Sequence, residues 1–240
     1  MKVALLGYGK MGKAIEAILQ EAGDTVVLKV DESNREQLTI ADLQQAEVAI
    51  EFSSPEAAVD NMKLCFDAGV PVVVGTTGWY DQFDAVNAYR EEKDGTLFYA
   101  TNFSVGVNLF FKLSELLATM MNEQEQYDAQ VQEVHHKQKK DAPSGTAITL
   151  AEGMLEKLQR KQQWVNKRTD NENDLTVLSY REDDVPGIHI INYESDIDSI
   201  EIKHTAKSRL GFARGAVDAA RWVVGRKGCY QMSDMLNFGL

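Results

Sequence analysis

The feature that most constrains the fold is a glycine-rich turn near the amino terminus. The apolar run Lys2–Leu6 leads into Gly7-Tyr8-Gly9-Lys10-Met11-Gly12, and a helical pattern follows over Lys10–Glu21. A GxGxxG sequence between a strand and a helix is typical of the first turn of a dinucleotide-binding βαβ unit. Gly7 would make the tight turn, Gly9 would admit the pyrophosphate, and Gly12 would let helix and strand pack closely. The helix amino terminus would offer free N–H groups to phosphate.

An acidic residue stands where such units contact the ribose. Asp31 ends the second apolar run, about 20 residues after the last glycine, and would accept a hydrogen bond from a ribose hydroxyl. A glycine turn without any ligand is the alternative. Strand, helix and acid together favour the dinucleotide site.

Apolar runs alternate with helical patterns through the first hundred residues. The runs lie at Lys2–Leu6, Thr25–Val30, Glu47–Phe52, Val70–Val74 and Thr96–Ala100, and the clearest helical patterns lie at Lys10–Glu21, Pro55–Ala68 and Trp79–Lys93. Nearly continuous apolar strands separated by helices indicate a parallel sheet covered on both faces. Right-handed crossovers would wind it as an α/β, Rossmann-type doubly wound domain.

Two further loops follow strands of this predicted sheet. Gly75-Thr76-Thr77-Gly78 follows the fourth strand, and Ala100-Thr101-Asn102-Phe103 follows the fifth. Loops at the carboxyl ends of parallel strands line the ligand crevice of an open α/β sheet. Ordinary turn chemistry is an equal alternative, because Gly, Thr and Asn are common turn residues.

The pattern changes after Phe103. Helices are expected over Gly106–Met121 and Ser144–Gln163, a strand over Tyr127–Gln138, a loop over Asn166–Asp174, and a meander of antiparallel strands at Leu175–Tyr180, Gly187–Tyr193 and Ile197–His204. Sequential strands without intervening helices indicate a second, α+β unit, with helices on one face of an open sheet.

The last helical pattern, Leu210–Val224, carries small apolar residues and is expected to pack back onto the first domain. Residues 1–103 together with 208–240 are therefore predicted to form the dinucleotide-binding domain. Residues 104–207 are predicted to form the second domain.

Composition excludes several classes of protein. A net charge of −12 disfavours a non-specific nucleic-acid binder or a protein of anionic membrane surfaces. No apolar run approaches the roughly 18 residues that a membrane span requires. Cys65 and Cys229 form no CxxC pair, so a disulfide framework is not expected and a cytoplasmic setting is favoured. The first residues reach glycine too early for a signal peptide.

Residues 133–147, EVHHKQKKDAPSGTA, hold the densest set of chemically active side chains. His135 and His136 are acid/base candidates, and on a strand they would face opposite sides. Lys139 would share the face of His135 if the strand continued, where it would stabilise an anion or donate a proton. Ser144-Gly145-Thr146 opens a helix whose N–H groups and two hydroxyls suit a carboxylate.

A solvated basic strand end, with Ser144 serving only as a helix cap, is the alternative. One concentrated basic patch in an acidic chain instead favours a pocket for an acidic substrate. His189 and His204 show no partner pattern and are expected to be ordinary strand residues. No metal site is expected, because adjacent histidines on a strand diverge and no third ligand stands at a suitable spacing.

Taken together, the motifs resemble the 4-hydroxy-tetrahydrodipicolinate reductase (dihydrodipicolinate reductase) family of the lysine pathway. The resemblance covers nearly the whole chain and rests on Gly7–Gly12, Gly75–Thr77, Asn102–Asn108 and, above all, Glu133–Ala147. Arg209–Ala216 is similar to the family's closing segment. The glycine loop is one residue tighter than in some relatives, and the second domain is compact.

The resemblance implies an NAD(P)H-dependent oxidoreductase with a cyclic dicarboxylate substrate, assembled as a homotetramer. It implies His135 as catalytic acid/base, Lys139 as proton donor, and His136, Ser144, Gly145 and Thr146 as substrate-binding residues. The residues implied to hold NADH or NADPH are Gly7, Tyr8, Gly9, Lys10, Met11, Gly12, Asp31, Gly75, Thr76, Thr77, Ala100, Thr101, Asn102 and Phe103.

Cofactor preference is predicted from the end of the second strand. Asp31 would repel a 2′-phosphate, and Glu32 adds a second negative charge beside it. Arg35 is the nearby cation that could bind the phosphate. We therefore expect NADH to be used at least as well as NADPH, with use of both as the alternative.

Two other functions remain open from the residues alone. Another small Rossmann reductase, such as an amino-acid dehydrogenase acting on an imine, would share Gly7–Gly12 without needing Ser144–Thr146. A non-catalytic nucleotide sensor would bind NADH tightly without turnover.

Overall fold

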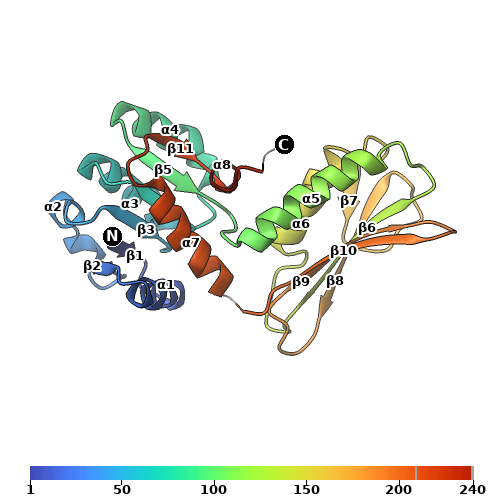
Figure 1. The fold of residues 1–240 in the computed structure, drawn as a ribbon, viewed down its shortest axis with the longest axis horizontal. Helices are drawn as coiled ribbons and strands as arrows, with labels where there is room; N and C mark the ends of the chain where they lie inside the picture. The colour runs from blue at the N-terminus through green and yellow to red at the C-terminus, as the bar shows by residue number, and fades with distance from the viewer. Residues whose placement is uncertain (209, 239–240) are drawn as a thin grey trace. The chain divides into compact units, whose positions relative to one another are not determined.

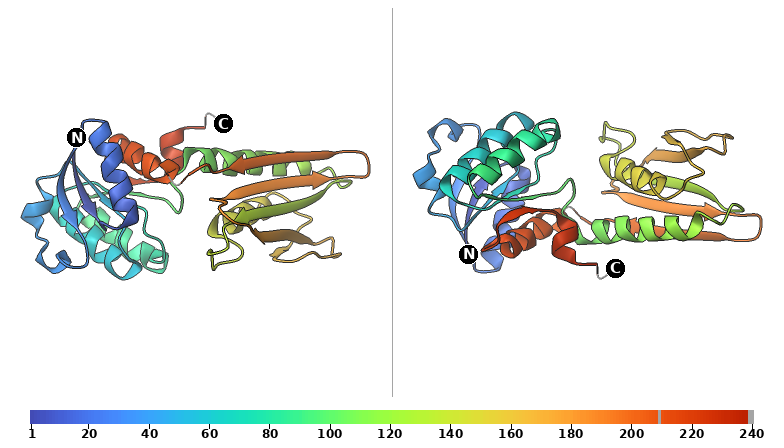
Figure 2. Two further views of the ribbon diagram at one scale, coloured as in Figure 1. Left: turned by 90° about the horizontal axis from the view of Figure 1, so that it is seen from below. Right: turned by 90° about the horizontal axis from the view of Figure 1, so that it is seen from above.

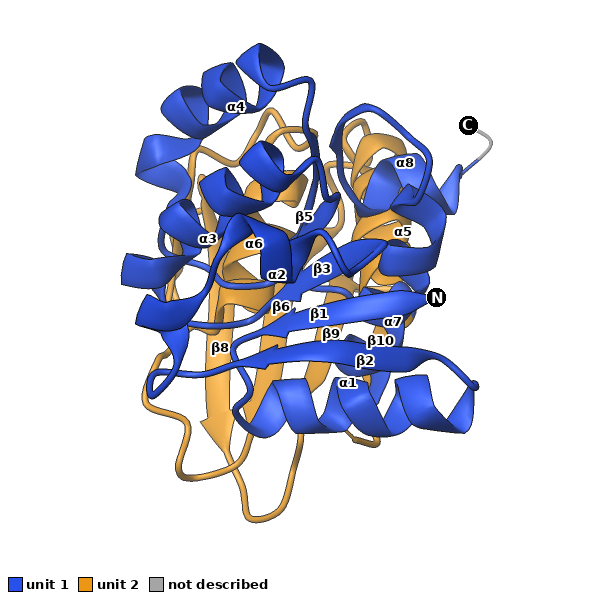
Figure 3. Cartoon of the chain, turned by 90° about the vertical axis from the view of Figure 1, so that its left-hand side faces the viewer, with its two compact units in different colours: residues 1–105, 210–240 blue, residues 106–209 orange. Residues whose placement is uncertain are grey.

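The computed structural model describes residues 1–208 and 210–238, and the chain divides into two compact units (Figure 3). Unit 1 comprises Met1–Val105 and the chain from Leu210 onward, and unit 2 comprises the intervening segment from Gly106. Arg209, part of the expected closing segment, lies outside the described residues. Within the described ranges, no helix has the length and apolar character that crossing a membrane would take.

Unit 1 is built on a sheet of six parallel strands in the order β11-β5-β4-β3-β1-β2 (Figure 1). The strands are β1 (Lys2–Leu6), β2 (Thr25–Val30), β3 (Val48–Glu51), β4 (Val72–Val74), β5 (Thr96–Tyr99) and β11 (Gly228–Tyr230). The helices are α1 (Lys10–Glu21), α2 (Ile40–Leu43), α3 (Pro55–Ala68), α4 (Phe83–Glu92), α7 (Leu210–Val223) and α8 (Met232–Leu236), with 3-10 turns η1 (Arg35–Gln37) and η2 (Tyr80–Gln82).

Helices cover both faces of this sheet, as Figure 2 shows. Successive strand residues point to opposite faces. Val3 and Leu5 therefore join the core under α1 and α7, and Ala4 and Leu6 join the core under α2, α3 and α4. The doubly wound parallel sheet predicted from the sequence is confirmed.

The return of the last long helix to the first unit is also confirmed, because α7 packs against α1 and the central strands. The sequence pattern did not predict β11, which pairs with β5 as the sixth strand. Three residues are too few to show the alternation that identifies a strand.

Unit 2 contains a mixed sheet in the order β10-β9-β6-β8-β7. Its strands are β6 (Asp128–His135), β7 (Gln163–Val165), β8 (Asp174–Arg181), β9 (Ile188–Glu194) and β10 (Ser199–Thr205). The expected antiparallel meander is correct for β9 and β10, which pair antiparallel, but wrong for β8, because β6 lies between β8 and β9 and runs parallel to β8. The physical reason is the helix that separates β6 from β8, since a helical crossover returns the chain parallel to the strand it left.

Helices α5 (Val105–Met121) and α6 (Gly145–Leu155) contribute to one core with the inward residues of β6, β8 and β9. The helix predicted over Ser144–Gln163 ends earlier than expected, at Leu155. Lys161 explains the change: it is buried, and its ammonium lies 2.6 Å from Asp128 Oδ1 and 3.0 Å from the Asp174 carbonyl oxygen. These contacts hold the chain at the sheet, where β7 begins.

Candidate functional site

The glycine turn of unit 1 has the geometry of a phosphate-binding turn. The N–H groups of Gly7 and Tyr8 donate to the Val30 carbonyl oxygen, both at 2.9 Å, which ties the turn to the end of β2. Gly7 has φ +98°, and a Cβ there would collide with the Phe52 carbonyl; a Cβ on Gly12 would collide with the Gly7 carbonyl. Beside Gly9, by contrast, no described atom lies within 4 Å of a Cβ position, so a ligand has room to approach the backbone.

Helix α1 leaves its first N–H groups available to a ligand. Gly9 is the N-cap, and no side chain caps this end of the helix among the described residues. Uncapped N–H groups and the positive end of the helix dipole together attract phosphate. Tyr8, Lys10 and Met11 belong to this same turn.

A cavity of about 480 Å³ opens beside the turn, within the size range of cofactor pockets. It is lined by Gly7, Tyr8, Gly9, Val30, Asp31, Glu32, Ser33, Arg35, Phe52, Ser53, Ser54, Ala57 and Asn61. The sequence reasoning named its glycines, Asp31, Glu32 and Arg35, but not the segment after β3 or Asn61. Only the parallel arrangement of β1 and β3 brings that segment to the same edge.

The polar side chains of the cavity are held by neighbours. Ser33 donates to Asp31 Oδ1 through its N–H at 2.9 Å and through its hydroxyl at 2.6 Å, and these bonds lower the pKa of Asp31. Arg35 Nε donates to Asn61 Oδ1, and Asn61 in turn donates to Glu51 at 3.3 Å. Burial raises the pKa of the Glu51 carboxyl, which lies completely inside unit 1.

The two other loops of unit 1 follow β4 and β5 as expected, but they do not line this cavity. Thr76 is buried and accepts from Trp79 Nε1 through its carbonyl at 2.9 Å. Phe103 is 2% exposed and packs against Phe98 in the core, with its ring centroid 5.8 Å from that of Phe52. Both loops nevertheless lie beside Phe52, which lines the cavity: Gly75 faces its ring, and Phe103 packs against it.

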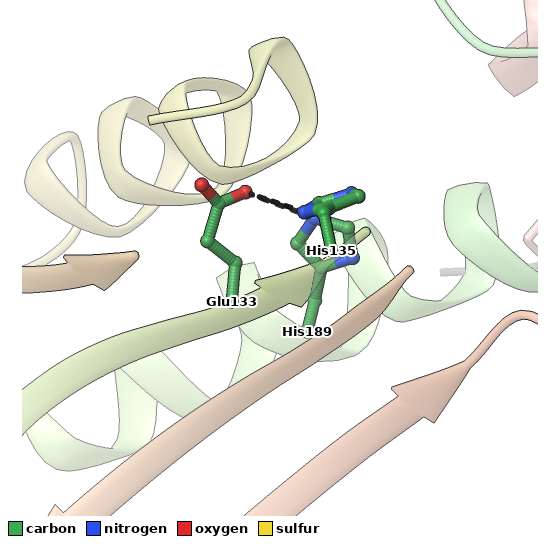
Figure 4. A group of neighbouring side chains, drawn as sticks. All are labelled: Glu133, His135 and His189. Atoms are coloured by element: carbon green, nitrogen blue, oxygen red, sulfur yellow. Dashed lines mark ion pairs between the residues drawn. The ribbon is translucent and has the colours of Figure 1, made fainter. Parts of the chain in front are cut away.

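In unit 2, β6 brings Glu133 and His135 to the same buried face of the sheet (Figure 4). The Nδ1 atom of His135 lies 3.2 Å from Oε2 of Glu133. Oε1 of Glu133 accepts from the Ser144 N–H at 3.0 Å and lies 3.4 Å from Arg181 Nη2. Burial alone would raise the pKa of this carboxyl, but its polar contacts with His135 and Ser144 outweigh burial and hold the pKa below its ordinary range.

Lys139 does not lie on a continuing strand, so the strand predicted through Gln138 is too long. β6 ends at His135, and the next residues form a turn closed by the Lys139 N–H donating to the His136 carbonyl at 3.1 Å. Lys139 Nζ lies 2.8 Å from Asp141 Oδ2. Arg181, which the sequence reasoning missed, donates to the carbonyls of Lys139 and Asp141. The turn therefore gathers cationic groups beside His135.

The Ser144-Gly145-Thr146 turn begins α6 as expected. Ser144 is buried and caps the helix, its hydroxyl accepting from the Ala147 N–H at 3.2 Å. Gly145 is exposed, with no described atom within 4 Å of a Cβ position, and Thr146 is half-buried. Gly145 and Thr146 are thus open to a ligand, whereas Ser144 is engaged with protein groups.

His189 is not an ordinary strand residue, and that expectation is wrong. Its Nε2 lies 3.3 Å from Ser144 Oγ and 3.7 Å from Glu133 Oε2, and its ring centroid lies 5.1 Å from that of His135. Burial, reinforced by the positive charge of His135, lowers the pKa of His189 to about 3. The ligand-type atoms of Glu133, His135 and His189 all lie within 4.8 Å of one another. Sequence spacing did not reveal His189 as a member of this group.

Comparison with known families gives matches over both halves of the chain. The family model described as "Dihydrodipicolinate reductase, N-terminus" matches residues 1–103, and "Dihydrodipicolinate reductase, C-terminus" matches residues 106–236. The 4-hydroxy-tetrahydrodipicolinate reductase of Christiangramia forsetii is 45% identical over 237 residues, covering 99% of this chain and 98% of that protein. The enzyme of the same name from Neisseria meningitidis serogroup A is 35% identical over 264 residues, covering 98% and 97%.

Solved structures show the same fold at lower identity. The dipicolinate-bound dihydrodipicolinate reductase from Paenisporosarcina sp. TG-14 has a TM-score of 0.76 at 22% identity, covering 98% of both chains. Aspartate semialdehyde dehydrogenase II from Vibrio cholerae has a TM-score of 0.55 at 13% identity, covering 93% of this chain and 98% of that one. The fold is therefore shared beyond a single activity.

Proposed function

Because this chain belongs to the dihydrodipicolinate reductase family, we propose that unit 1 holds its nicotinamide cofactor and unit 2 holds its cyclic dicarboxylate substrate. The chain is an NAD(P)H-dependent oxidoreductase that reduces 4-hydroxy-tetrahydrodipicolinate to tetrahydrodipicolinate, a step of the diaminopimelate route of lysine biosynthesis. The observation that carries this function is the match of both family models in succession, together with 45% identity over nearly the full length of a relative.

The residues of unit 1 fit a dinucleotide. Gly9 leaves open space at an uncapped helix amino terminus, which suits the pyrophosphate. Asp31 lies in the cavity wall, where Ser33 orients its carboxylate, and would accept a hydrogen bond from a ribose hydroxyl. The loops Gly75–Thr77 and Ala100–Phe103 complete the proposed site nearer the nicotinamide.

Use of both cofactors is part of this proposal, with NADH used at least as well as NADPH. Asp31 and Glu32 line the cavity and repel a 2′-phosphate, whereas Arg35 lines the same cavity and can attract one. The hydrogen bond from Arg35 to Asn61 orients the guanidinium without consuming its remaining donors.

Unit 2 contains two sets of groups that can bind carboxylates. The exposed N–H of Gly145 and the hydroxyl of Thr146 stand at the amino terminus of α6, where a carboxylate is stabilised by the helix dipole. His136 and Lys139 lie in the neighbouring turn and supply positive charge and hydrogen-bond donors. Two carboxylate-binding sets of groups suit a substrate with two carboxylates. The buried Ser144 hydroxyl caps the amino terminus of this helix.

When bound, the reduced nicotinamide supplies a hydride to a ring carbon of an α,β-unsaturated cyclic imine. The chain's own groups then have two tasks: to deliver a proton to the neighbouring carbon and to neutralise the developing charge. We assign proton donation to Lys139 Nζ and the acid/base role to His135. Loss of the 4-hydroxyl as water gives the conjugated double bond, and one hydride and one proton then add across it, so the overall reaction balances.

The test is an absorbance assay of NADH and NADPH oxidation with freshly generated substrate. Turnover with the hydroxylated cyclic dicarboxylate, and none with acyclic imines, is the expected result. Tight NADH binding without turnover on this substrate would contradict the activity and favour a nucleotide sensor. Turnover on acyclic imines alone would favour an amino-acid dehydrogenase.

A homotetramer is also proposed, and the open face of the unit 2 sheet supports it. The face away from α5 and α6 carries Val134, Leu178, Ile188 and Ile190, all half-buried. Half-buried apolar residues on a sheet face are typical of a surface that another subunit covers. Light scattering after size exclusion should give a tetramer for the natural chain and a smaller species for Ile190→Lys. A monomeric natural chain would contradict the proposal.

A cytoplasmic location is also proposed. Cys65 and Cys229 are free thiols, as suits a reducing compartment. Fractionation of cells expressing the tagged chain should recover it with cytoplasmic markers.

A further inference from the structure

Ionisable side chains form a row across three strands of unit 2. Glu133 of β6 lies opposite His189 of β9, and His189 lies opposite His204 of β10. His135 stands two residues beyond Glu133, so it points to the same face of the sheet. Glu133, His135 and His189 are no more than 7% exposed, which makes this an interior cluster rather than a solvated surface.

The two carboxylate oxygens of Glu133 differ in their hydrogen bonding. Oε1 is occupied by the Ser144 N–H and the Arg181 guanidinium. Oε2 has no hydrogen bond of regular geometry among the described residues, and the same holds for His135 Nδ1, yet these two buried atoms are 3.2 Å apart. Because buried polar atoms rarely remain unpaired, each is the natural partner of the other.

We propose that Glu133 is a positioning residue for His135, an inference that rests on the acid/base role of His135 proposed above. The Glu133 carboxylate accepts the Nδ1–H of His135, so the ring exposes an unprotonated Nε2 that can take up and return a proton. A carboxylate in this position also stabilises the imidazolium that forms when Nε2 is protonated. The lowered pKa of Glu133 keeps it a carboxylate at neutral pH.

The surroundings of the ring match this role. A Cβ on Gly187 would lie only 3.1 Å from His135 Nε2, so any larger residue at this position would crowd that nitrogen. His189, held neutral by burial, packs edge-on against His135 at an interplanar angle of 73°. Ser144 contacts both Glu133 and His189, which couples the start of α6 to the cluster.

A metal ion is the other occupant that these ligand types could serve. Arg181 argues against it, since its guanidinium lies 3.4 Å from Glu133 Oε1 and already supplies a positive charge to this carboxylate. The Arg181 guanidinium would repel a divalent cation bound to Oε2 of the same buried carboxylate. The proposal therefore assigns Glu133 to hydrogen bonding.

The first test measures the protonation of the His135 ring directly. In the full-length natural chain labelled with ¹⁵N-histidine, two-bond ¹H–¹⁵N spectra should show neutral His135 protonated on Nδ1, with His135→Gln assigning the signals. In Glu133→Gln the amide can donate to Nδ1, so the proton should move to Nε2. A natural chain whose neutral His135 carries its proton on Nε2 overturns the proposal, and this measurement requires no variant at Glu133 to fold.

The second test is kinetic. Glu133→Gln should lower kcat about 10²-fold, and no further than His135→Gln does, while KM and the Kd for NADH change less than about threefold. The matched control is Glu194→Gln, an exposed carboxylate at the far end of β9, which should retain the natural kcat. An unchanged kcat in a folded Glu133→Gln overturns the proposal.

The two hypotheses fail in different ways. If His135→Gln retains the natural kcat, the acid/base role of His135 fails, whatever the ring protonation shows. If His135→Gln is impaired but Glu133→Gln leaves both kcat and the ring protonation unchanged, only the positioning role fails. Stoichiometric binding of Zn²⁺ to the purified natural chain, lost in Glu133→Gln, would also overturn the hydrogen-bonding assignment.

Discussion

At the scale of single residues, His135 is the group on which the proposed chemistry depends most. His135→Gln keeps the approximate size of the side chain but removes its proton exchange, so kcat should fall about 10²–10⁴-fold. The Kd for NADH should hardly change, because the proposed cofactor site lies in unit 1. Steady-state kinetics and fluorescence titration of NADH measure the two quantities. A kcat for His135→Gln equal to that of the natural chain would refute the assignment.

Thr146 tests the carboxylate site at the start of α6. Thr146→Val removes the hydroxyl and keeps the shape, so KM for substrate should rise by the equivalent of roughly 1.5–3 kcal/mol, the value of a hydrogen bond to a charged group. The Kd for NADH should stay constant. Thr149→Val, an exposed position one turn further along α6, is the matched control. An unchanged KM in Thr146→Val would move the carboxylate elsewhere.

Asp31 tests the cofactor preference. Asp31→Ser removes the negative charge from the cavity wall and keeps a hydroxyl, so the ratio of kcat/KM for NADPH to that for NADH should rise. The measurement compares both cofactors in the natural chain and the variant. Asp84→Ser on α4 removes an exposed charge elsewhere in unit 1 and should leave the ratio unchanged. A natural preference for NADPH that Asp31→Ser does not alter would mean that Asp31 does not contact the ribose.

At the scale of secondary-structure elements, the start of α6 joins stability to function. Ser144 caps the helix and contacts Glu133 and His189, so Ser144→Ala should lower the free energy of unfolding by about 1–2 kcal/mol and also reduce kcat/KM. Urea denaturation and steady-state kinetics measure the two effects.

The matched control for this cap lies in unit 1. Thr39 caps α2 through a capping box, and Thr39→Ala removes the same kind of bond away from the cluster. It should reduce stability without reducing kcat/KM. If both variants affected kcat/KM equally, the coupling between the α6 cap and the histidine cluster would be contradicted.

At the scale of the whole molecule, moderate acid should destabilise the fold. The pKa of His189 is about 3 in the folded chain, because of burial first and the charge of His135 second, against 6.5 in an exposed histidine. Below pH 6.5 the unfolded chain therefore binds a proton that the folded chain does not. The free energy of unfolding should then fall by up to about 1.4 kcal/mol per pH unit from this residue, until the pH approaches 3.

Urea denaturation at pH 7, 6 and 5 measures this slope. Burial also lowers the pKa of His204, which adds to the trend, so the contribution of His189 is read from the difference between the natural chain and His189→Gln. Glu133 contributes little between pH 7 and 6, because its carboxylate is ionised in the folded chain and almost fully ionised in the unfolded chain; its contribution near pH 5 is shared by the natural chain and the variant. Equal slopes in the natural chain and the variant would contradict the prediction.

The sequence by itself determined unit 1 closely, because the interactions that shape it are local. β1, β2, α1 and α3 have the predicted bounds, since apolar runs, helical periodicity and the glycine turn are all encoded within a few neighbouring residues. The same local coding placed His135 on a strand, although it extended that strand past His135 to Gln138, and it placed Ser144 at the cap of a helix. It also carried the motif by which the family was identified.

Only the tertiary structure decided which strands are neighbours in unit 2, and with that the composition of the histidine cluster. Side-chain alternation encodes the face to which a residue points but not the strand beside it. Because β6 lies between β8 and β9, Glu133 meets His189, and Arg181 of β8 lies opposite His135. These partners are 45 or more residues apart in the chain, so their contacts depend on the register of strand pairing, which no local pattern records.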